Sequence, residues 1–143
     1  MGSLFTRKEA IIRTDISHET KKRVVLCINA ALERKATNLT VLRVNELTTV
    51  ADYFIFMSGS SDRQVQATAQ FIRETLKKSN IVPLGIEGEH TGKWILMDYG
   101  DIVVHIFYEP VREFYDIENL WSDAPRMEID DTVQKLTALD DHM

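Results

Sequence analysis

The sequence predicts a single α/β domain with a mixed sheet and flanking helices, in the order α-β-β-α-β-β-β-α. Three observations predict this class. The chain has 143 residues, the usual length of one domain with a hydrophobic core of its own. Its hydrophobic fraction of 44% and charged fraction of 27% are those of an ordinary globular protein. Segments in which apolar residues have helical spacing alternate with short apolar runs bounded by turn residues.

The first helix is expected to begin after Ser17, a typical N-cap residue, and to end near Lys35. The apolar residues of its inner face follow one side of a helix: Val24, Val25, Ile28, Ala31 and Leu32. A strand with β-branched residues is expected over residues 39–44. The next strand, residues 53–57, has the sequence YFIFM, and such a continuous apolar run favours burial on both faces of a sheet.

The second helix is expected over residues 62–78, with Ser60 or Ser61 as its N-cap. Its inner face repeats at helical spacing: Val65, Thr68, Ala69, Ile72 and Leu76. Asn80 is suited to end the helix in a left-handed conformation. Residues 82–84 are expected to form a short edge strand, because their central proline cannot donate a hydrogen bond to a central ladder.

Residues 85–92 contain three glycines and are expected to form a polar loop. Two strands follow, over residues 93–97 and 102–108, and a four-residue connection with a glycine joins them as a hairpin. A third helix is expected to have Pro110 in its first turn and to end at Pro125. The inner face of this helix is expected to carry Phe114, Ile117 and Trp121.

The charge of the chain is unevenly distributed. The formal net charge is −5, and residues 116–143 carry eight acidic residues against two basic ones. We expect residues 1–16 to form a loosely ordered arm, residues 17–124 the folded domain and residues 125–143 an acidic tail. The remaining residues, 1–115, are nearly neutral in charge, whereas nucleic-acid binding usually depends on a strongly basic surface. The sequence therefore argues against direct, sequence-specific binding of nucleic acid.

The cellular compartment is predicted from what the sequence lacks. Cys27 is the only cysteine, so no internal disulfide can form and a reducing compartment is expected. No apolar run approaches the roughly 18 residues of a membrane span, and the N-terminus lacks the apolar block of a signal peptide. We expect a cytoplasmic protein with no membrane partner. Cys27 lies beside the inner face of the first helix and is interpreted as a buried thiol in preference to a nucleophile.

Few residues offer catalytic chemistry. The four histidines and the cysteine lack the spacing of metal ligands, and His105 is interpreted as a packed, hydrogen-bonded side chain in preference to a catalytic base. The Gly59-Ser60-Ser61 turn before a helix is the best candidate phosphate cradle, and nucleotidyltransferases use a similar turn. Those enzymes also need paired carboxylates for Mg²⁺, which the following strands lack. We expect the protein to have no catalytic activity and to bind no metal or cofactor. The alternative is a degenerate protein of nucleotidyltransferase fold that still binds nucleotides.

Large side chains gather around the predicted hairpin turn. Trp94, Met97 and Tyr99 surround a turn that also contains Asp98 and Asp101. Tryptophan and tyrosine are residue types that dominate the energetics of protein interfaces. The competing interpretation is that Trp94 is an ordinary core residue of its strand, and the residues alone do not decide between the two.

Three segments of the chain resemble the ribosomal silencing factor family, RsfS, also called Iojap. They are DYFIFMSGSSDRQVQATAQFI (residues 52–72), GIEGEHTGKWILMDYGDIVVHIF (residues 85–107) and REFYDIENLW (residues 112–121). The resemblance covers roughly residues 21–122, so residues 17–124 are identified as the RsfS/Iojap-like domain. It implies a nucleotidyltransferase-like fold without catalytic activity. It also implies that the protein binds the large ribosomal subunit through ribosomal protein uL-fourteen, blocks an intersubunit bridge and subunit joining, and so represses translation.

The resemblance also implies a partner-binding surface on the sheet face and hairpin. By matching motifs, it assigns an apolar anchor to Trp94, a polar contact to Asp98 and contact area with a hydroxyl to Tyr99. Met97 and Asp101 are further candidates for the same surface.

Family members also form homodimers, which would use the same open face and compete with ribosome binding. Arg112, Glu118 and Trp121 are interpreted as structural residues of the third helix. A homodimeric domain without a ribosomal role is a further alternative.

Overall fold

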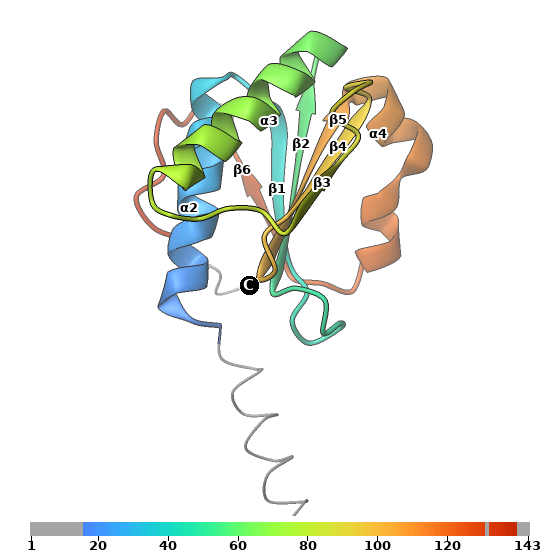
Figure 1. Cartoon of the computed structure of the whole chain (residues 1–143). Coiled ribbons are helices and arrows are strands. Elements are labelled where there is room, and N and C mark those ends of the chain that lie inside the picture. Colours follow the sequence, from blue (N-terminus) through green and yellow to red (C-terminus); the bar gives the residue numbers. More distant parts are fainter. Residues whose placement is uncertain (1–15, 131, 140–143) are drawn as a thin grey trace, which may run out of the picture.

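A mixed sheet of six strands forms the centre of the chain in a computed structural model, which describes residues 16–130 and 132–139 (Figure 1). The strand order is β3-β4-β5-β2-β1-β6. The strands are β1 (Thr37–Arg43), β2 (Tyr53–Gly59), β3 (Gly85–Glu87), β4 (Trp94–Asp98), β5 (Ile102–Tyr108) and β6 (Arg126–Ile129). The helices of this part of the chain are α2 (His18–Glu33), α3 (Asp62–Lys77), α4 (Glu109–Tyr115) and the 3₁₀-helix η1 (Ile117–Trp121).

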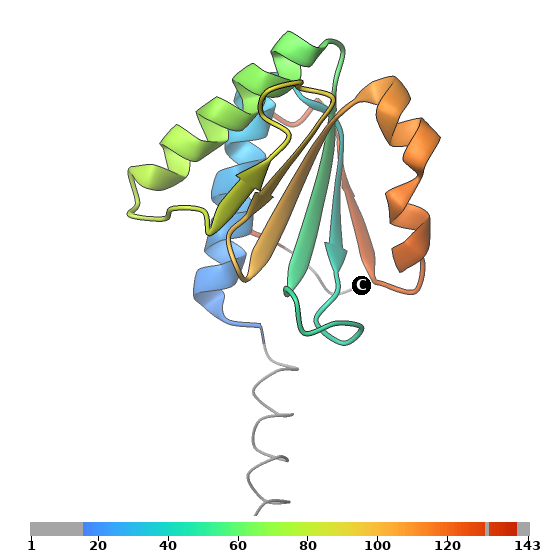
Figure 2. The same cartoon turned by 45° about the vertical axis from the view of Figure 1, so that its right-hand side comes forward.

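The sheet separates two helical layers. Strands β2 and β5 are parallel, whereas the other four neighbouring pairs are antiparallel. Helices α2 and α3 cover one face of the sheet, and α4 continues into η1 on the opposite face (Figure 2). The mixed α/β class is therefore confirmed, and β4 and β5 form the predicted antiparallel hairpin.

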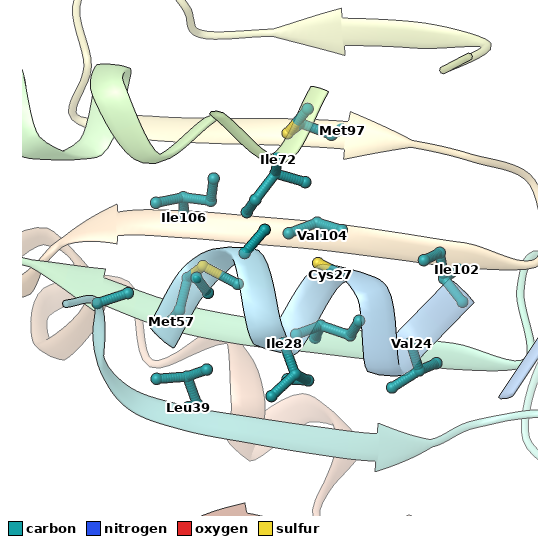
Figure 3. Close-up of a cluster of buried hydrophobic side chains, with 14 of the residues drawn as sticks. Val24, Cys27, Ile28, Leu39, Met57, Ile72, Met97, Ile102, Val104 and Ile106 are labelled. Atoms are coloured by element: carbon teal, nitrogen blue, oxygen red, sulfur yellow. The ribbon is translucent and has the colours of Figure 1, made fainter. Parts of the chain in front are cut away.

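The main core fills the space between the sheet and helices α2 and α3. Side chains alternate along each strand, so Ile102, Val104 and Ile106 of β5 point toward these helices. Figure 3 shows them facing Ile72 of α3 and Cys27 of α2. The predicted inner face of α3 is fully confirmed. On α2 the helical spacing is confirmed, although Val25 and Leu32 are only partly buried and the true centre includes Cys27 and Ala30.

A smaller, aromatic core lies on the other face of the sheet. It contains Phe54, Phe56, Val103 and Phe107, against which Trp121 of η1 packs. Strand β2 contributes buried side chains to both cores and is buried along its whole length, as its continuous apolar sequence predicted.

The predicted N-caps are present. The Ser17 hydroxyl accepts a hydrogen bond from the Thr20 N–H at 3.1 Å, and the Ser61 hydroxyl accepts one from the Gln64 N–H at 3.1 Å. Asn80 has φ 62°, the left-handed conformation expected after α3. These contacts use backbone donors that the first turn of a helix leaves without intrahelical partners.

Two predicted elements differ in the structure. Residues 82–84 form no strand; the edge strand is Gly85–Glu87, which pairs with β4 inside the segment predicted to be a loop. The predicted third helix stops at Tyr115, because Asp116 adopts φ 47° and turns the chain into η1. Phe114 therefore points away from the core and is 80% exposed, so its predicted inner position is wrong.

The segment beyond Pro125 contributes more structure than the sequence indicated. Strand β6 pairs antiparallel with β1 and forms one edge of the sheet. Farther on, the Asn29 side chain donates to the Leu136 carbonyl at 2.9 Å and accepts from the Leu136 N–H at 2.7 Å. These two bonds attach the C-terminal segment to α2. The predicted N-terminal arm, apart from Ile16, lies outside the described residues.

Candidate functional site

Helices α4 and η1 cover only part of their face of the sheet. Along β4, Ile95 and Met97 are buried against the α2–α3 side, so the intervening side chains project toward the α4 side. Trp94, Leu96 and Asp98 are all half-buried there. We call Trp94, Leu96, Asp98 and the neighbouring Glu87 of β3 the open sheet face.

Trp94 lies at the border between the open sheet face and the aromatic core. Its rings stack on Phe107 with centroids 4.9 Å apart, and Tyr115 of α4 lies 5.5 Å away on a tilted plane. Its indole Nε1–H donates a hydrogen bond to Nδ1 of His105 at 3.1 Å. Trp94 is thus neither a fully buried core residue nor a free surface side chain, but a half-buried ring held at a set orientation.

His105 is the packed, hydrogen-bonded histidine that the sequence predicted. Its ring stacks on Phe56 at 4.7 Å with an interplanar angle of 11°, and the residue is 6% exposed. Burial lowers the pKa of His105 to about 4, and the nearby charge of Glu118 opposes this shift only in part. His105 is therefore neutral at pH 7, in agreement with its Nδ1 acting as the acceptor for Trp94.

The low pKa of His105 makes folding sensitive to acid. The ordinary pKa is 6.5, so between pH 4 and 6.5 the unfolded chain binds more protons than the folded chain, and acidification favours unfolding. We expect this group to lower the free energy of unfolding by about 2 kcal/mol between pH 7 and pH 5. Urea unfolding of the wild type and His105→Leu at both pH values tests this. On acidification from pH 7 to pH 5 the variant should lose less free energy of unfolding than the wild type. Equal losses would contradict the low pKa assigned to His105.

The five candidate binding residues divide between the two sides of the sheet. Trp94 and Asp98 both face the open sheet face, from opposite ends of β4, and one Asp98 carboxylate oxygen also accepts a hydrogen bond from the Gly100 N–H at 2.8 Å. Met97 is fully buried and Tyr99 is 5% exposed, both in the core beneath α2 and α3. Asp101 accepts hydrogen bonds from Thr20 and Arg23 and so ties α2 to the hairpin.

Burial also prevents Tyr99 from making the partner contact that was predicted for its hydroxyl. Its hydroxyl has no hydrogen-bond partner within the described part of the chain, and burial raises the pKa of Tyr99 to about 12. A surface contact by this hydroxyl is inconsistent with its position. Leu96 and Glu87 of the open sheet face were not among the predicted site residues, although strand alternation from Trp94 would have identified Leu96.

Gly88, which directly follows β3, lies close against the backbone of Trp94. It has φ 84°, and a Cβ at this position would collide with the carbonyl oxygen of Trp94. We expect Gly88→Ala to lower the free energy of unfolding by at least ~2 kcal/mol, because it adds both backbone strain and a clash. Gly85→Ala is the matched control, since its Cβ would have nothing within 4 Å. Urea unfolding should show a change within about 0.5 kcal/mol for the control; similar losses in both variants would contradict the prediction.

The turn considered as a phosphate cradle is occupied by the protein itself. The Gln64 side-chain oxygen accepts from the Ser60 N–H at 2.6 Å and from the Ser60 hydroxyl at 2.9 Å. The Ser61 hydroxyl caps the next turn. Within residues 16–130 and 132–139, no group of three or more histidine, cysteine or acidic side chains is placed to hold a metal ion. This geometry gives a nucleotide no unoccupied donor at Ser60.

Arg112 anchors α4 and η1 to the sheet. It is 8% exposed and forms two hydrogen bonds to the Glu118 carboxylate, at 2.8 and 2.9 Å. It also donates to the Asn38 carbonyl at 2.7 Å and the Ser58 hydroxyl at 2.8 Å. Burial alone would raise the pKa of Glu118, but the hydrogen bonds and charges of Arg112 and Arg126 hold it below its usual value. The network supports the structural role predicted for Arg112 and Glu118.

Comparison with known proteins identifies the family of this chain. A family model described as "Ribosomal silencing factor during starvation" matches residues 17–142. The chain belongs to the RsfS family. The ribosomal silencing factor RsfS of Halalkalibacterium halodurans is 34% identical over 108 residues, which are 76% of this chain and 92% of that protein. RsfS of Bacillus subtilis is 38% identical over 98 residues, which are 68% and 83% of the two chains.

The fold of this RsfS family member also agrees with a solved structure. A crystal structure of a protein from Chromobacterium violaceum matches with a TM-score of 0.69 and 37% sequence identity, over 71% of this chain and 84% of the other. The RsfS resemblance predicted from the sequence is therefore confirmed. Family membership supports a ribosome-associated, regulatory role in silencing translation. In the described part of the chain, no helix has the length and apolar character needed to cross a membrane.

Proposed function

We propose that this protein binds the large ribosomal subunit through ribosomal protein uL-fourteen and prevents the small subunit from joining. Its open sheet face would dock on the partner and occupy an intersubunit bridge, so that translation is repressed by steric exclusion and without catalysis. The observation that carries this proposal is Trp94, which is half-buried and held in place at the edge of an uncovered part of the sheet.

The chemistry of the open sheet face suits a protein partner. Trp94 and Leu96 supply apolar area that the partner can remove from water, and tryptophan is enriched among residues that dominate binding energy. Tyr115, 54% exposed, extends this apolar area onto α4. Glu87, paired with Leu96, and Asp98, at the far end of β4, place acidic groups on the same face, which favours a partner with basic groups at its rim.

Only two of the five candidate residues are proposed to touch the partner, because Met97 and Tyr99 are buried and Asp101 is bonded to α2. We assign direct contact to Trp94 and Asp98 and indirect roles to Met97, Tyr99 and Asp101. Met97 and Tyr99 fill the core behind β4 and the hairpin turn, and Asp101 holds that turn on α2. These three would preserve the shape of the open sheet face from behind.

We further propose that the protein acts in the cytoplasm and that two copies associate through the same face. A homodimer of this kind would cover Trp94 and would compete with the ribosome. The apparent affinity for the ribosome, counted on total protein, should then fall as the protein concentration rises, because dimerisation covers the shared surface in a growing fraction of the molecules.

Sedimentation with purified ribosomal subunits tests the proposed function. The wild-type protein should move with large subunits and not with small subunits, and its addition before mixing should reduce the yield of joined ribosomes. Free protein that stays at the top of the gradient at physiological salt would contradict the proposal.

A nucleoside triphosphate with Mg²⁺ should leave the melting temperature of the protein unchanged. A rise would favour the nucleotide-binding alternative, because ligands stabilise the state that they bind.

A further inference from the structure

The hydrogen bond between Trp94 and His105 joins two neighbouring strands. In the β4–β5 register, Trp94 lies opposite Phe107 and Leu96 lies opposite His105. His105 is thus the diagonal neighbour of Trp94 on the same face, within reach of a long aromatic side chain. The indole Nε1 and the imidazole Nδ1 are 3.1 Å apart.

The acceptor is itself held rigidly. The His105 ring stacks on Phe56 with centroids 4.7 Å apart and on Phe107 with centroids 6.2 Å apart, and it forms a T-shaped pair with Phe54 at 5.7 Å. These three rings leave the imidazole little freedom to rotate. The direction of the Nδ1 lone pair is therefore set by the aromatic core, and the indole follows that direction.

We propose that His105 is a positioning residue for the partner-binding surface: it orients Trp94 by accepting the hydrogen bond that the indole N–H donates. This inference rests on the proposed function. The bond and the stacking on Phe107 together fix the indole before the partner arrives. Fixing an interface side chain in advance lowers the entropy lost on binding, so its benefit appears as affinity.

A matched pair of substitutions separates positioning from packing. Asparagine and leucine branch alike at Cγ, but only asparagine places an oxygen near the position of the His105 Nδ1 atom. His105→Asn should bind large subunits within about twofold of the wild type. His105→Leu should bind about 3- to 10-fold more weakly, as expected for the loss of one hydrogen bond. The indole N–H resonance of Trp94 should shift in the leucine variant and stay close to the wild-type position in the asparagine variant.

A double substitution tests whether His105 acts through Trp94. Trp94→Phe removes the indole donor and keeps an aromatic ring. In that background, adding His105→Leu should cause no further loss of affinity, because the interaction no longer exists. A further loss of the same 3- to 10-fold would overturn the inference and indicate general packing.

The binding data also distinguish this inference from the proposed function. If the wild type does not move with large subunits, the proposed function fails and the inference falls with it. If the wild type binds and His105→Leu binds equally well, only the inference is overturned. Equal weakening in the asparagine and leucine variants would likewise overturn it, since the acceptor atom would then have no effect.

Discussion

Replacing Trp94 with alanine is expected to raise the Kd for large ribosomal subunits by at least about 30-fold, the effect of losing a hot-spot residue. The indole is the largest side chain of the open sheet face, and its orientation is already fixed by Phe107 and His105. Truncation removes both the contact area and this preorganisation. The measurement is co-sedimentation at increasing concentrations of large subunits, with the fold checked by circular dichroism.

Phe71→Ala is the control for the Trp94 variant. Phe71 is also a partly buried aromatic residue, but it lies on α3 at the opposite side of the sheet, beneath the Arg34 guanidinium. Its truncation should lower stability and leave affinity for the subunits within about twofold, since it removes no group from the open sheet face. If the two variants bind equally well, the open sheet face is not the contact surface.

Much of the fold could be predicted because its local and tertiary preferences agree. In α3 the N-cap, the spacing of Val65, Ala69 and Ile72, and the left-handed Asn80 all indicate the same helix. In β2 the apolar run indicates a central strand, and the sheet order places it there. Each of these signals is contained within a few consecutive residues.

The elements that escaped prediction depend on distant partners. Strand β6 has the short sequence RMEI, in which alternate side chains are exposed, and its backbone is a strand only because β1 lies beside it. Strand β3 likewise needs β4 as its partner. Helix α4 ends early because Asp116 turns left-handed, which the continuous helical spacing of Phe114 and Trp121 did not reveal.

Strand geometry changes which of the predicted site residues can share one surface. The motif assigned Trp94, Met97, Asp98 and Tyr99 to one surface, but side chains of a strand alternate between its faces. Trp94, Leu96 and Asp98 therefore share one side, while Met97 points to the other. Tyr99, just past the end of β4, continues the alternation into the α2–α3 core. The Trp94–His105 bond depends on the register between two strands and so could be found only in the structure.

The largest loss of stability is expected from Arg112→Met, at about 3–5 kcal/mol, as for other broken buried ion pairs. The substitution leaves the half-buried Glu118 carboxylate with Arg126 alone and removes the donor to the Asn38 carbonyl and the Ser58 hydroxyl. Urea unfolding measures the change. Arg126→Met is the matched control, because Arg126 is exposed and its pair with Glu118 should contribute less than about 1 kcal/mol.

Removing both partners of the pair separates an unpaired charge from lost packing. Arg112→Met combined with Glu118→Met should be more stable than Arg112→Met alone by about 1–2 kcal/mol, because no carboxylate remains without its main partner. Arg112 also fixes α4, whose Tyr115 lies against Trp94, so the single variant should weaken subunit binding as well. If the double variant is less stable than Arg112→Met, Glu118 stabilises the fold independently of Arg112, and the ion pair is not the link between the helical layer and the sheet.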